Sequence, residues 1–510
     1  MKTKALLIIG LTFFCISSCN DDILDKDNPA QLSNVTFFRN DVQAIAAVNS
    51  VYAGLQGTNM YTREYFFLHD LLSDDNQSGG GQLEAVRAQV LNHNFDGSNS
   101  VMSQVWTGLY RMILRANYVI QNITDPANEE FISEGTRTRV EGEARYLRAW
   151  SYFELVSLWG GVPLLTTTDP TALPDGTPRA SEEEVYTQIF TDLDIAEENL
   201  PLKSGYPGTD LGRATQGAAQ ALRAKILMFQ GNYEEALAPL EEVIGSGEYS
   251  LVDRYLDNFE AENENNAESI WEVQFSDDFG VAGNWNADGA DIAEITFRGQ
   301  EYGPNAWRNL IPSSSLVEEF ETVADGATKD DPRFGYSFYQ VGDMFNNGTE
   351  MLTADIVNGD ASNPSWRKYE TIYKKPTEDQ RSGINFRVIR YADVLLMMAE
   401  VQNELNGPAA ALPFINQVRA REDVDMPPYP TAQYPCSNQE EMLDAIVHER
   451  RVEMSSEQIR NRDIRRWRRQ GKLDAEPIST YEPRYDLLPI PVVEIDNNDS
   501  LSVEDQNPDY

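Results

Sequence analysis

Apolar side chains recur at intervals of three and four residues along most of the chain, the spacing that places them on one face of an α-helix. The first such stripe consists of Ile45, Val48, Tyr52 and Leu55. Between Arg137 and Trp159 the sequence is apolar on most helical faces, so we expect that helix to lie deep in the core. It should end at Gly160, because glycine adopts the left-handed cap and the nearby Pro163 does not continue a helix.

Two Ser-x-x-Glu sequences predict where helices begin. They start at Ser181 and at Ser437, and each precedes an apolar-periodic run. In such a capping box the serine oxygen accepts a hydrogen bond from the third helical amide, while the glutamate side chain reaches back to the amide of the serine.

A helical-hairpin repeat is visible twice. In the first, stripes within 219–229 and 236–244 flank Gly231-Asn232-Tyr233, similar to the turn of a tetratricopeptide repeat. The second runs from Tyr391 to Leu405, turns at 406–408 and continues at 412–421, which contains Pro413. Because proline fits only the first turn of a helix, this last helix should begin near residue 410.

The segment between the two hairpins has a different texture. It is rich in Gly, Asn, Asp and Tyr and contains short β-like runs such as 269–273. Loops carried on a scaffold are where binding residues concentrate. We therefore predict a mainly α protein, a tetratricopeptide-like helical-hairpin scaffold with a large loop-rich insertion carrying short β segments. Its parts are one domain, 39–510, with scaffold at 39–254 and 390–475, a ligand-binding insertion at 255–389 and an irregular C-terminal wrap at 476–510.

The composition fits a folded, acidic protein. Hydrophobic residues make up 41% and aromatic residues 10%, enough for a full core. The formal net charge of −41 repels phosphate backbones and argues against a nucleic-acid partner. The basic cluster at 460–469 alternates with Asp463 and is expected to pair with acidic groups inside the fold.

The first residues predict export. Lys2 and Lys4 precede a short apolar run, too short to span a bilayer, so residues 1–18 resemble a signal peptide. Small residues lead to Cys19, similar to a bacterial lipobox; we expect Cys19 to be lipidated and residues 19–38 to form a tether. The alternative is ordinary cleavage that leaves Cys19 unmodified. Of the three cysteines only Cys436 then remains free, so no structural disulfide is expected.

Several sequence blocks, in order, resemble the SusD/RagB family of outer-membrane lipoproteins of Bacteroidetes. They are EARYLRAWSYFELVSLWGGVPL at 143–164, RYADVLLMMAEVQNELN at 390–406, INQVRARE at 415–422, HERRVEMSSEQIRNRDIRRW at 448–467, LLPIPVVEID at 487–496 and the terminal QNPDY. Asp21-Asp22 also resembles the surface-export signal of such lipoproteins. Two departures stand out, since the family usually has glycine at the positions of Gln458 and Asp509.

The resemblance implies a function. Family members capture nutrients, most often oligosaccharides, outside the cell and pass them to a partner SusC-like TonB-dependent transporter barrel. For this chain it implies a lipid-anchored protein of the outer membrane that faces the exterior. Some members serve peptide importers, which leaves peptide capture as an alternative.

The tryptophans divide by context. Those in apolar-periodic helices are expected in the core: Trp106, Trp150, Trp159 and Trp467. Trp271, in a strand-like run, is expected to be half-buried. The candidates for stacking on a sugar lie in polar loops: Trp285, Trp307 and Trp366. The alternative is that these rings only pin loops to the scaffold. Arg298, Tyr302, Arg308 and Tyr339 are candidates to complete the platform.

A second candidate is the polar loop at 72–81. Asp74, Asp75 and Asn76 precede three glycines, which allow the backbone to approach a ligand closely. Family members carry a similar acidic loop near the ligand surface, while plain turn chemistry is the alternative. A calcium loop of the EF-hand type is not expected, because Ala85 occupies the position of its bidentate glutamate.

The sequence offers little for catalysis. It lacks Gly-x-Ser-x-Gly, His-Glu-x-x-His and the phosphate-binding glycine-lysine loop, and it has only three histidines. No enzymatic activity, metal or cofactor is therefore expected. A surface glycoside hydrolase is the remaining alternative, and it would need two carboxyl groups about 5–10 Å apart beside the aromatic platform. Clustered loop tryptophans would favour a sugar ligand, whereas a polar cleft with few aromatic rings would favour a peptide.

Overall fold

The computed structural model describes residues 37–168, 176–278 and 294–510. The predicted signal peptide, Cys19, nearly all of the tether and Trp285 lie outside these residues. No helix in the described ranges is both long enough and apolar enough to cross a membrane.

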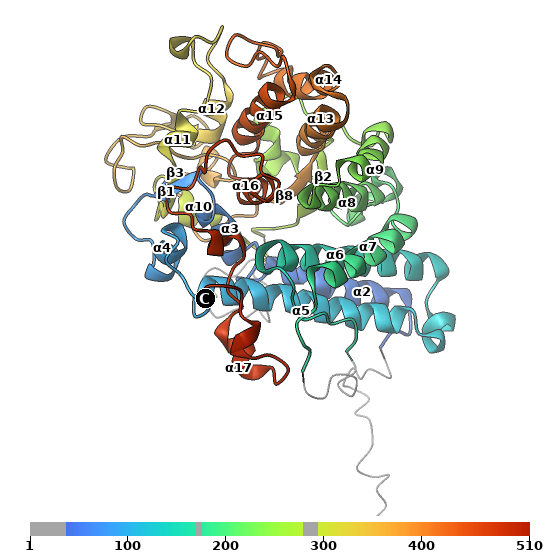
Figure 1. The fold of residues 1–510 in the computed structure, drawn as a ribbon. Helices are drawn as coiled ribbons and strands as arrows, with labels where there is room; N and C mark the ends of the chain where they lie inside the picture. Colours follow the sequence, from blue (N-terminus) through green and yellow to red (C-terminus); the bar gives the residue numbers. More distant parts are fainter. Residues whose placement is uncertain (1–36, 169–175, 279–293) are drawn as a thin grey trace, which may run out of the picture.

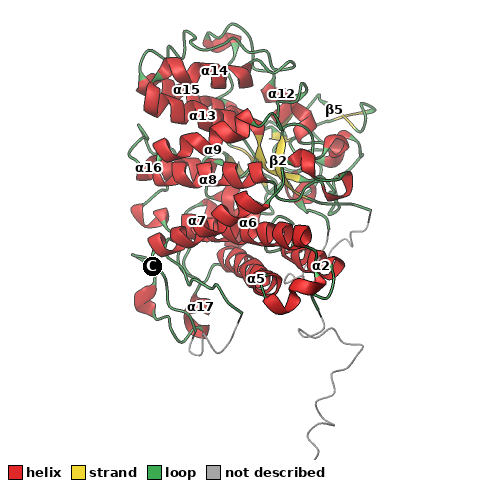
Figure 2. Ribbon diagram, turned by 90° about the vertical axis from the view of Figure 1, so that its right-hand side faces the viewer, coloured by secondary structure: helices red, strands yellow, loops and turns green. Residues whose placement is uncertain are grey.

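Helices dominate the scaffold and pack side by side into a stack (Figures 1 and 2). The N-terminal part contains α2 (Asp41–Tyr52), α3 (Glu64–Leu71), α4 (Ala85–Leu91), α5 (Ser100–Ile123), α6 (Glu134–Trp159), α7 (Glu182–Asn199), α8 (Gln216–Gln230) and α9 (Tyr233–Gly245). The C-terminal part contains α13 (Tyr391–Asn406), α14 (Pro408–Arg419), α15 (Gln439–Met454), α16 (Arg460–Arg469) and α17 (Val492–Asn497). The stack continues from α9 directly to α13, so the two predicted hairpins are neighbours in space although the insertion separates them in sequence.

The local signals for helix ends hold in most places. The amide of Glu184 donates to Ser181 Oγ at 3.2 Å and the amide of Ser181 to Glu184 Oε2 at 2.8 Å, which confirms the first capping box. The second was wrong by one residue, because Asn438 caps α15 by accepting from the amide of Glu441. The α14 helix starts at Pro408, earlier than predicted, and holds Pro413 inside it.

The insertion is made of loops, short helices and short antiparallel strand pairs. Its helices are α10 (Arg298–Tyr302), α11 (Ser314–Val317) and α12 (Arg333–Ser337). Its strands, with β1 (Asn76–Ser78) from the scaffold, are β2 (Ser269–Val273), β3 (Leu310–Pro312), β4 (Phe338–Tyr339), β5 (Met344–Phe345), β6 (Glu350–Met351), β7 (Ser365–Trp366) and β8 (Phe386–Arg390). The pairs are β1–β3, β2–β8, β4–β7 and β5–β6, so β2 and β8 join the two ends of the insertion.

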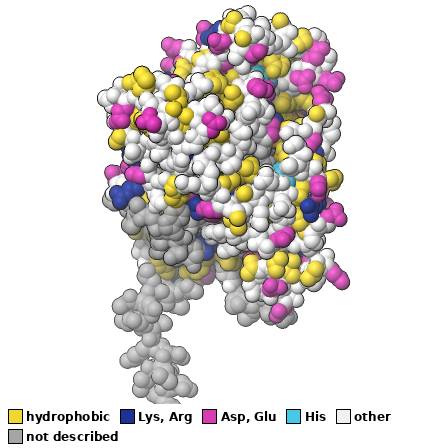
Figure 3. All heavy atoms as spheres, turned by 90° about the vertical axis from the view of Figure 1, so that its left-hand side faces the viewer, with side chains coloured by type: hydrophobic (Ala, Val, Ile, Leu, Met, Phe, Trp, Pro, Cys, Tyr) yellow, Lys and Arg dark blue, Asp and Glu magenta, His cyan; other side chains and the backbone are white. Residues whose placement is uncertain are grey.

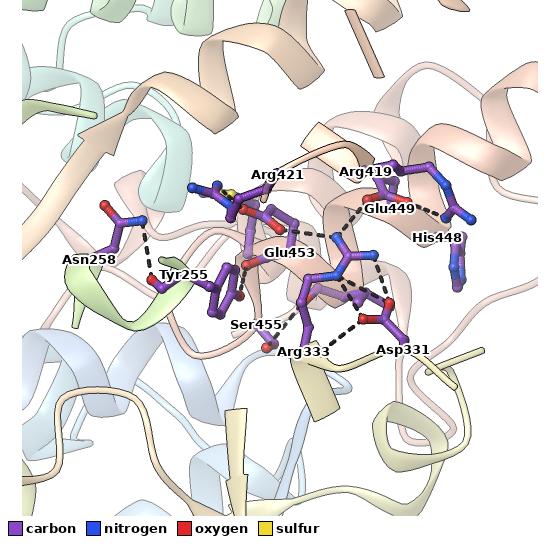
Figure 4. Close-up of polar contacts among 12 residues, drawn as sticks. Tyr255, Asn258, Asp331, Arg333, Arg419, Arg421, His448, Glu449, Glu453 and Ser455 are labelled. Atoms are coloured by element: carbon purple, nitrogen blue, oxygen red, sulfur yellow. Dashed lines mark hydrogen bonds and ion pairs between the residues drawn. The ribbon is translucent and has the colours of Figure 1, made fainter. Parts of the chain in front are cut away.

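A buried ion-pair network fixes the insertion to the scaffold (Figure 4). Glu453 on α15 accepts hydrogen bonds from Arg333 Nη1 at 3.0 Å, Arg390 Nη1 at 2.7 Å and Arg421 Nη2 at 2.9 Å. Arg333 belongs to α12 of the insertion, Arg390 ends β8, and Arg421 follows α14. Because buried charges are tolerated only when paired, this network specifies how the insertion sits on the helices.

The core matches the helical pattern closely. Trp106, Trp150, Trp159 and Trp467 are all buried, as predicted. Trp271 is fully buried, not half-buried, because β2 packs under the scaffold as well as against β8. The C-terminal wrap contains α17, a short helix that its proline-rich sequence did not predict.

Candidate ligand-binding site

A groove of about 620 Å³ lies between α4, β1, α11 and the C-terminal wrap. Ser78 and Gly81 line one side, Asn92 and His93 line the end of α4, and Pro477–Thr480 closes it from the wrap. This groove includes part of the loop at 72–81 that the sequence analysis singled out. Figure 3 shows the face of the molecule on which these elements lie, with acidic side chains scattered over it and few basic ones.

The three glycines of this loop serve different contacts. The amide of Gly79 donates to Asn309 O at 3.2 Å and that of Gly80 to Arg308 O at 2.6 Å. A Cβ on either glycine would meet a backbone oxygen of the 307–308 segment at less than 3 Å. Their absence of a side chain therefore lets the loop approach the insertion, which corrects the expectation that all three admit a ligand. Gly81 has φ +78° and no neighbour near the position of a Cβ. Of the three glycines, it is the one that lines the groove.

The acidic residues of the loop are paired. Asp74 accepts from Arg460 Nε at 2.7 Å and pairs with Arg451 Nη2 at 2.9 Å. Burial raises the pKa of Asp74, but Arg460 and Arg451 outweigh burial and hold it below its usual value. Asp75 is buried and pairs with Arg451 Nε at 2.9 Å. The loop is thus acidic in sequence, but the carboxylates of Asp74 and Asp75 are both paired with arginines.

His93 joins α4 to the C-terminal wrap. Its Nδ1 lies 3.0 Å from Thr480 Oγ1, and its backbone has a left-handed φ of 51°. Burial lowers the pKa of His93, and Arg465 and Arg468 lower it further, to about 4. The imidazole is therefore neutral at physiological pH. His93, Asn92 and Ser479 could not be predicted as lining residues, because only the fold brings them to the loop.

The predicted tryptophans separate in the structure. Trp307 is half-buried and lies against the glycine loop, where Asn358 Nδ2 donates to its carbonyl oxygen at 3.2 Å. Trp366 is buried, and its Nε1 donates to Asn76 Oδ1 at 3.1 Å, so it has no face for a ligand. Its exposure was wrongly expected. Trp307 and the loop at 72–81 are therefore neighbours, while Trp366 and Asn76 form a contact behind them.

The four residues proposed to complete the platform are interior. Tyr302 is buried and donates to Asp70 Oδ2 at 2.9 Å, and Arg298 stacks over the Tyr302 ring and contacts Ser456. Tyr339 belongs to a small apolar cluster of the insertion. These positions correct the expectation of an exposed ring and guanidinium platform.

Arg308 is likewise buried and holds a loop together. Its guanidinium donates to the carbonyls of Asn358, Asp360 and Asn363 at 2.7–3.0 Å. It thereby shapes the segment beside Trp307 without reaching the groove.

Among the described residues that line the groove, Asp74 and His93 are those with a carboxylate or an imidazole. No group of three or more His, Cys, Asp or Glu side chains in the described residues is placed to hold a metal ion. Among the lining residues of the groove, Asp74 is the single carboxylate, whereas glycoside hydrolysis uses two.

A stack of helical hairpins that carries a loop-built groove defines a helical-repeat binding protein. The family model "SusD family" matches residues 267–479, and the model "Starch-binding associating with outer membrane" matches residues 22–228. The chain belongs to the SusD/RagB family, as the sequence blocks indicated.

Individual relatives support the same assignment over the whole chain. "SusD-like protein P25" of Formosa agariphila is 27% identical over 99% of both chains. The solved structure of a "Laminarin binding SusD-like protein" is 27% identical, with a TM-score of 0.75 over 92% of this chain and 100% of that one. A SusD superfamily protein from Bacteroides vulgatus, 24% identical, shares the fold with a TM-score of 0.77 over 93% of this chain and 100% of its own.

Proposed function

We propose that this protein is a surface lipoprotein that binds an oligosaccharide and delivers it, unaltered, to a partner TonB-dependent transporter barrel. Anchoring through Cys19 in the outer membrane, facing outward, belongs to the same proposal. Family membership and the family description of association with the outer membrane support it.

The observation that carries the proposal is the groove beside the glycine loop. It offers hydroxyl and amide side chains, among them Ser78, Asn92 and Ser479, which are exposed and suited to sugar hydroxyls. Trp307 does not line the groove, but its backbone contacts Gly80 of the adjoining loop and its side chain is half-buried, so its ring is the candidate for stacking on a sugar. A relative of 27% identity is described as laminarin-binding.

Peptide capture is the second candidate. Among the described residues that line the groove there is no Trp, Tyr or Phe, and a polar groove without rings also suits a peptide backbone. The site would then be carried by hydrogen bonds alone, without a contribution from Trp307.

The full chain in detergent, titrated calorimetrically with laminarin, maltodextrin and xylan oligosaccharides and with a mixed peptide library, separates the two. We expect heat of binding from at least one glycan and none from the peptides. Products are analysed after prolonged incubation, and we expect the oligosaccharide to be recovered at its original length. Released monosaccharide would contradict binding without catalysis, and peptide binding alone would contradict the glycan proposal.

A further inference from the structure

We propose that the groove between α4, β1 and the 477–480 segment selects uncharged oligosaccharides and rejects glycans that carry sulfate or uronic-acid groups. This inference rests on the proposed function and adds the charge class of the ligand. The basis is the set of charged side chains at the groove and the ion pairs that each of them already forms.

The lining of the groove holds one formal charge in the described part of the chain. That charge is Asp74, and its two oxygens already accept from Arg460 and Arg451 at 2.7–3.0 Å. Arg451 is buried, and the Arg460 side chain is 12% exposed. Arg460 Nη1 has no hydrogen-bond partner among the described residues but has almost no exposed surface, so neither guanidinium reaches an anionic sugar in the groove. An anionic ligand would lose its hydration without gaining an opposite charge, which is unfavourable in a partly enclosed site.

The acidic side chains beside the groove are likewise paired with basic ones. Glu84 follows the lining residue Leu83, is partly exposed, and pairs with Arg63 Nη2 and Arg87 Nη1, both at 2.8 Å. Behind Ser315, Glu319 pairs with Arg451 Nη1 at 3.2 Å and with His448 Nδ1 at 2.7 Å. No lysine or arginine is among the described lining residues.

The one remaining titratable group of the lining is His93, which is neutral at physiological pH. Thr480 contacts its Nδ1, and the Tyr485 ring lies 5.1 Å from the imidazole. Arg465 and Arg468 of α16 oppose its protonation, and Glu476 favours it more weakly. An imidazole held neutral accepts or donates a hydrogen bond but attracts no anion. The groove therefore presents hydroxyls, amides, apolar side chains, one arginine-paired carboxylate and one neutral imidazole to its ligand.

The test compares neutral with anionic polysaccharides on the full chain in detergent. The neutral set is laminarin, maltodextrin and xylan oligosaccharides, and the anionic set is alginate and carrageenan oligosaccharides. We expect binding from the neutral set only. The affinity of the protein for the neutral oligosaccharides should change by less than about twofold between ~0.05 and ~0.5 M NaCl, because salt screening weakens only contacts between charges.

A charge-insertion variant ties the selectivity to the groove. Ser479→Lys places one unpaired ammonium at an exposed lining position, and we expect it to gain about tenfold in affinity for alginate oligosaccharides at ~0.05 M NaCl and to lose that gain at ~0.5 M. Thr191→Lys adds the same charge to an exposed position of α7 outside the groove and should gain nothing.

The outcomes are distinguishable. Anionic glycans that bind the unmodified protein as tightly as neutral ones would overturn the charge selectivity and leave the proposed function standing. Neutral binding with no response of Ser479→Lys would overturn the groove as the site. Absence of binding by either set would overturn the proposed function, and the inference with it.

Discussion

Gly80 lies so close to Trp307 that a Cβ on Gly80 would stand 2.2 Å from the Trp307 carbonyl oxygen. The Gly80 amide also donates to Arg308 O. The glycine loop and the 307–308 segment are thereby held in backbone contact, although one comes from the scaffold and the other from the insertion. This contact sets the position of Trp307 relative to the groove.

Gly80→Ala should destabilise the protein by about 1–3 kcal/mol, because the new methyl group must push two backbone segments apart. Urea unfolding measures the change. Gly135→Ala is the matched control, since nothing lies within 4 Å of its Cβ position in the first turns of α6, and it should be neutral or stabilising by up to about 1 kcal/mol. Equal effects of the two substitutions would contradict the close contact.

Trp307→Ala should weaken oligosaccharide binding by about 1–3 kcal/mol, the usual loss for an aromatic ring that stacks at the centre of an interface. Isothermal titration with the glycan that binds the unmodified protein gives the value. Trp307→Phe keeps a flat ring and should retain part of the affinity. If Trp307→Ala binds as well as the unmodified protein, Trp307 only supports the loop.

Helical periodicity predicted the scaffold because each helix carries its own burial pattern. The α6 helix is apolar on most faces and is buried along its C-terminal two thirds, with its end at Gly160 at φ 74°. The arginines of α16 were expected to pair inside the fold, and Arg466 binds Glu400 while Arg462 binds Glu154. In both cases the sequence within one helix was sufficient.

The insertion could not be predicted in this way, because burial there depends on contacts between distant segments. Trp366 lies in a polar stretch, yet β7 pairs with β4 and the indole packs against Phe338 in the core. The groove is a similar case, since His93 and Thr480, which meet in it, are 387 residues apart. No local composition distinguishes Ser479 from other exposed serines.

Asp509 has a left-handed φ of 67° at an exposed position where the family usually has glycine. A residue with a Cβ is strained in this region, whereas glycine is not. Asp509→Gly should therefore stabilise the protein by about 0.5–1 kcal/mol, as measured by the urea midpoint. Asp499→Gly is the matched control, because Asp499 is also exposed but is not left-handed, and it should lose about 0.5–1 kcal/mol.

His448 extends the buried network of Figure 4 toward the insertion. Its Nδ1 lies 2.7 Å from Glu319 Oε1 and its Nε2 3.5 Å from Glu321 Oε1. Burial alone would lower the pKa of His448, but the hydrogen bond with Glu319 and the ion pair with Glu321 outweigh burial and raise it to about 9. The folded protein therefore holds this proton more tightly than the unfolded chain, whose histidine has a pKa of about 6.5.

The raised pKa of His448 makes stability depend on pH. Its contribution should be complete below pH ~6.5 and should disappear as the pH rises to ~9, a loss of about 3 kcal/mol in the free energy of unfolding. In His448→Gln the free energy of unfolding should fall by that much less between these two pH values. Urea unfolding at several pH values measures the difference. His93→Gln is the control, since the pKa of His93 is lowered to about 4 and its proton is released below this range. An unchanged slope in His448→Gln would mean that Glu319 and Glu321 do not hold the proton.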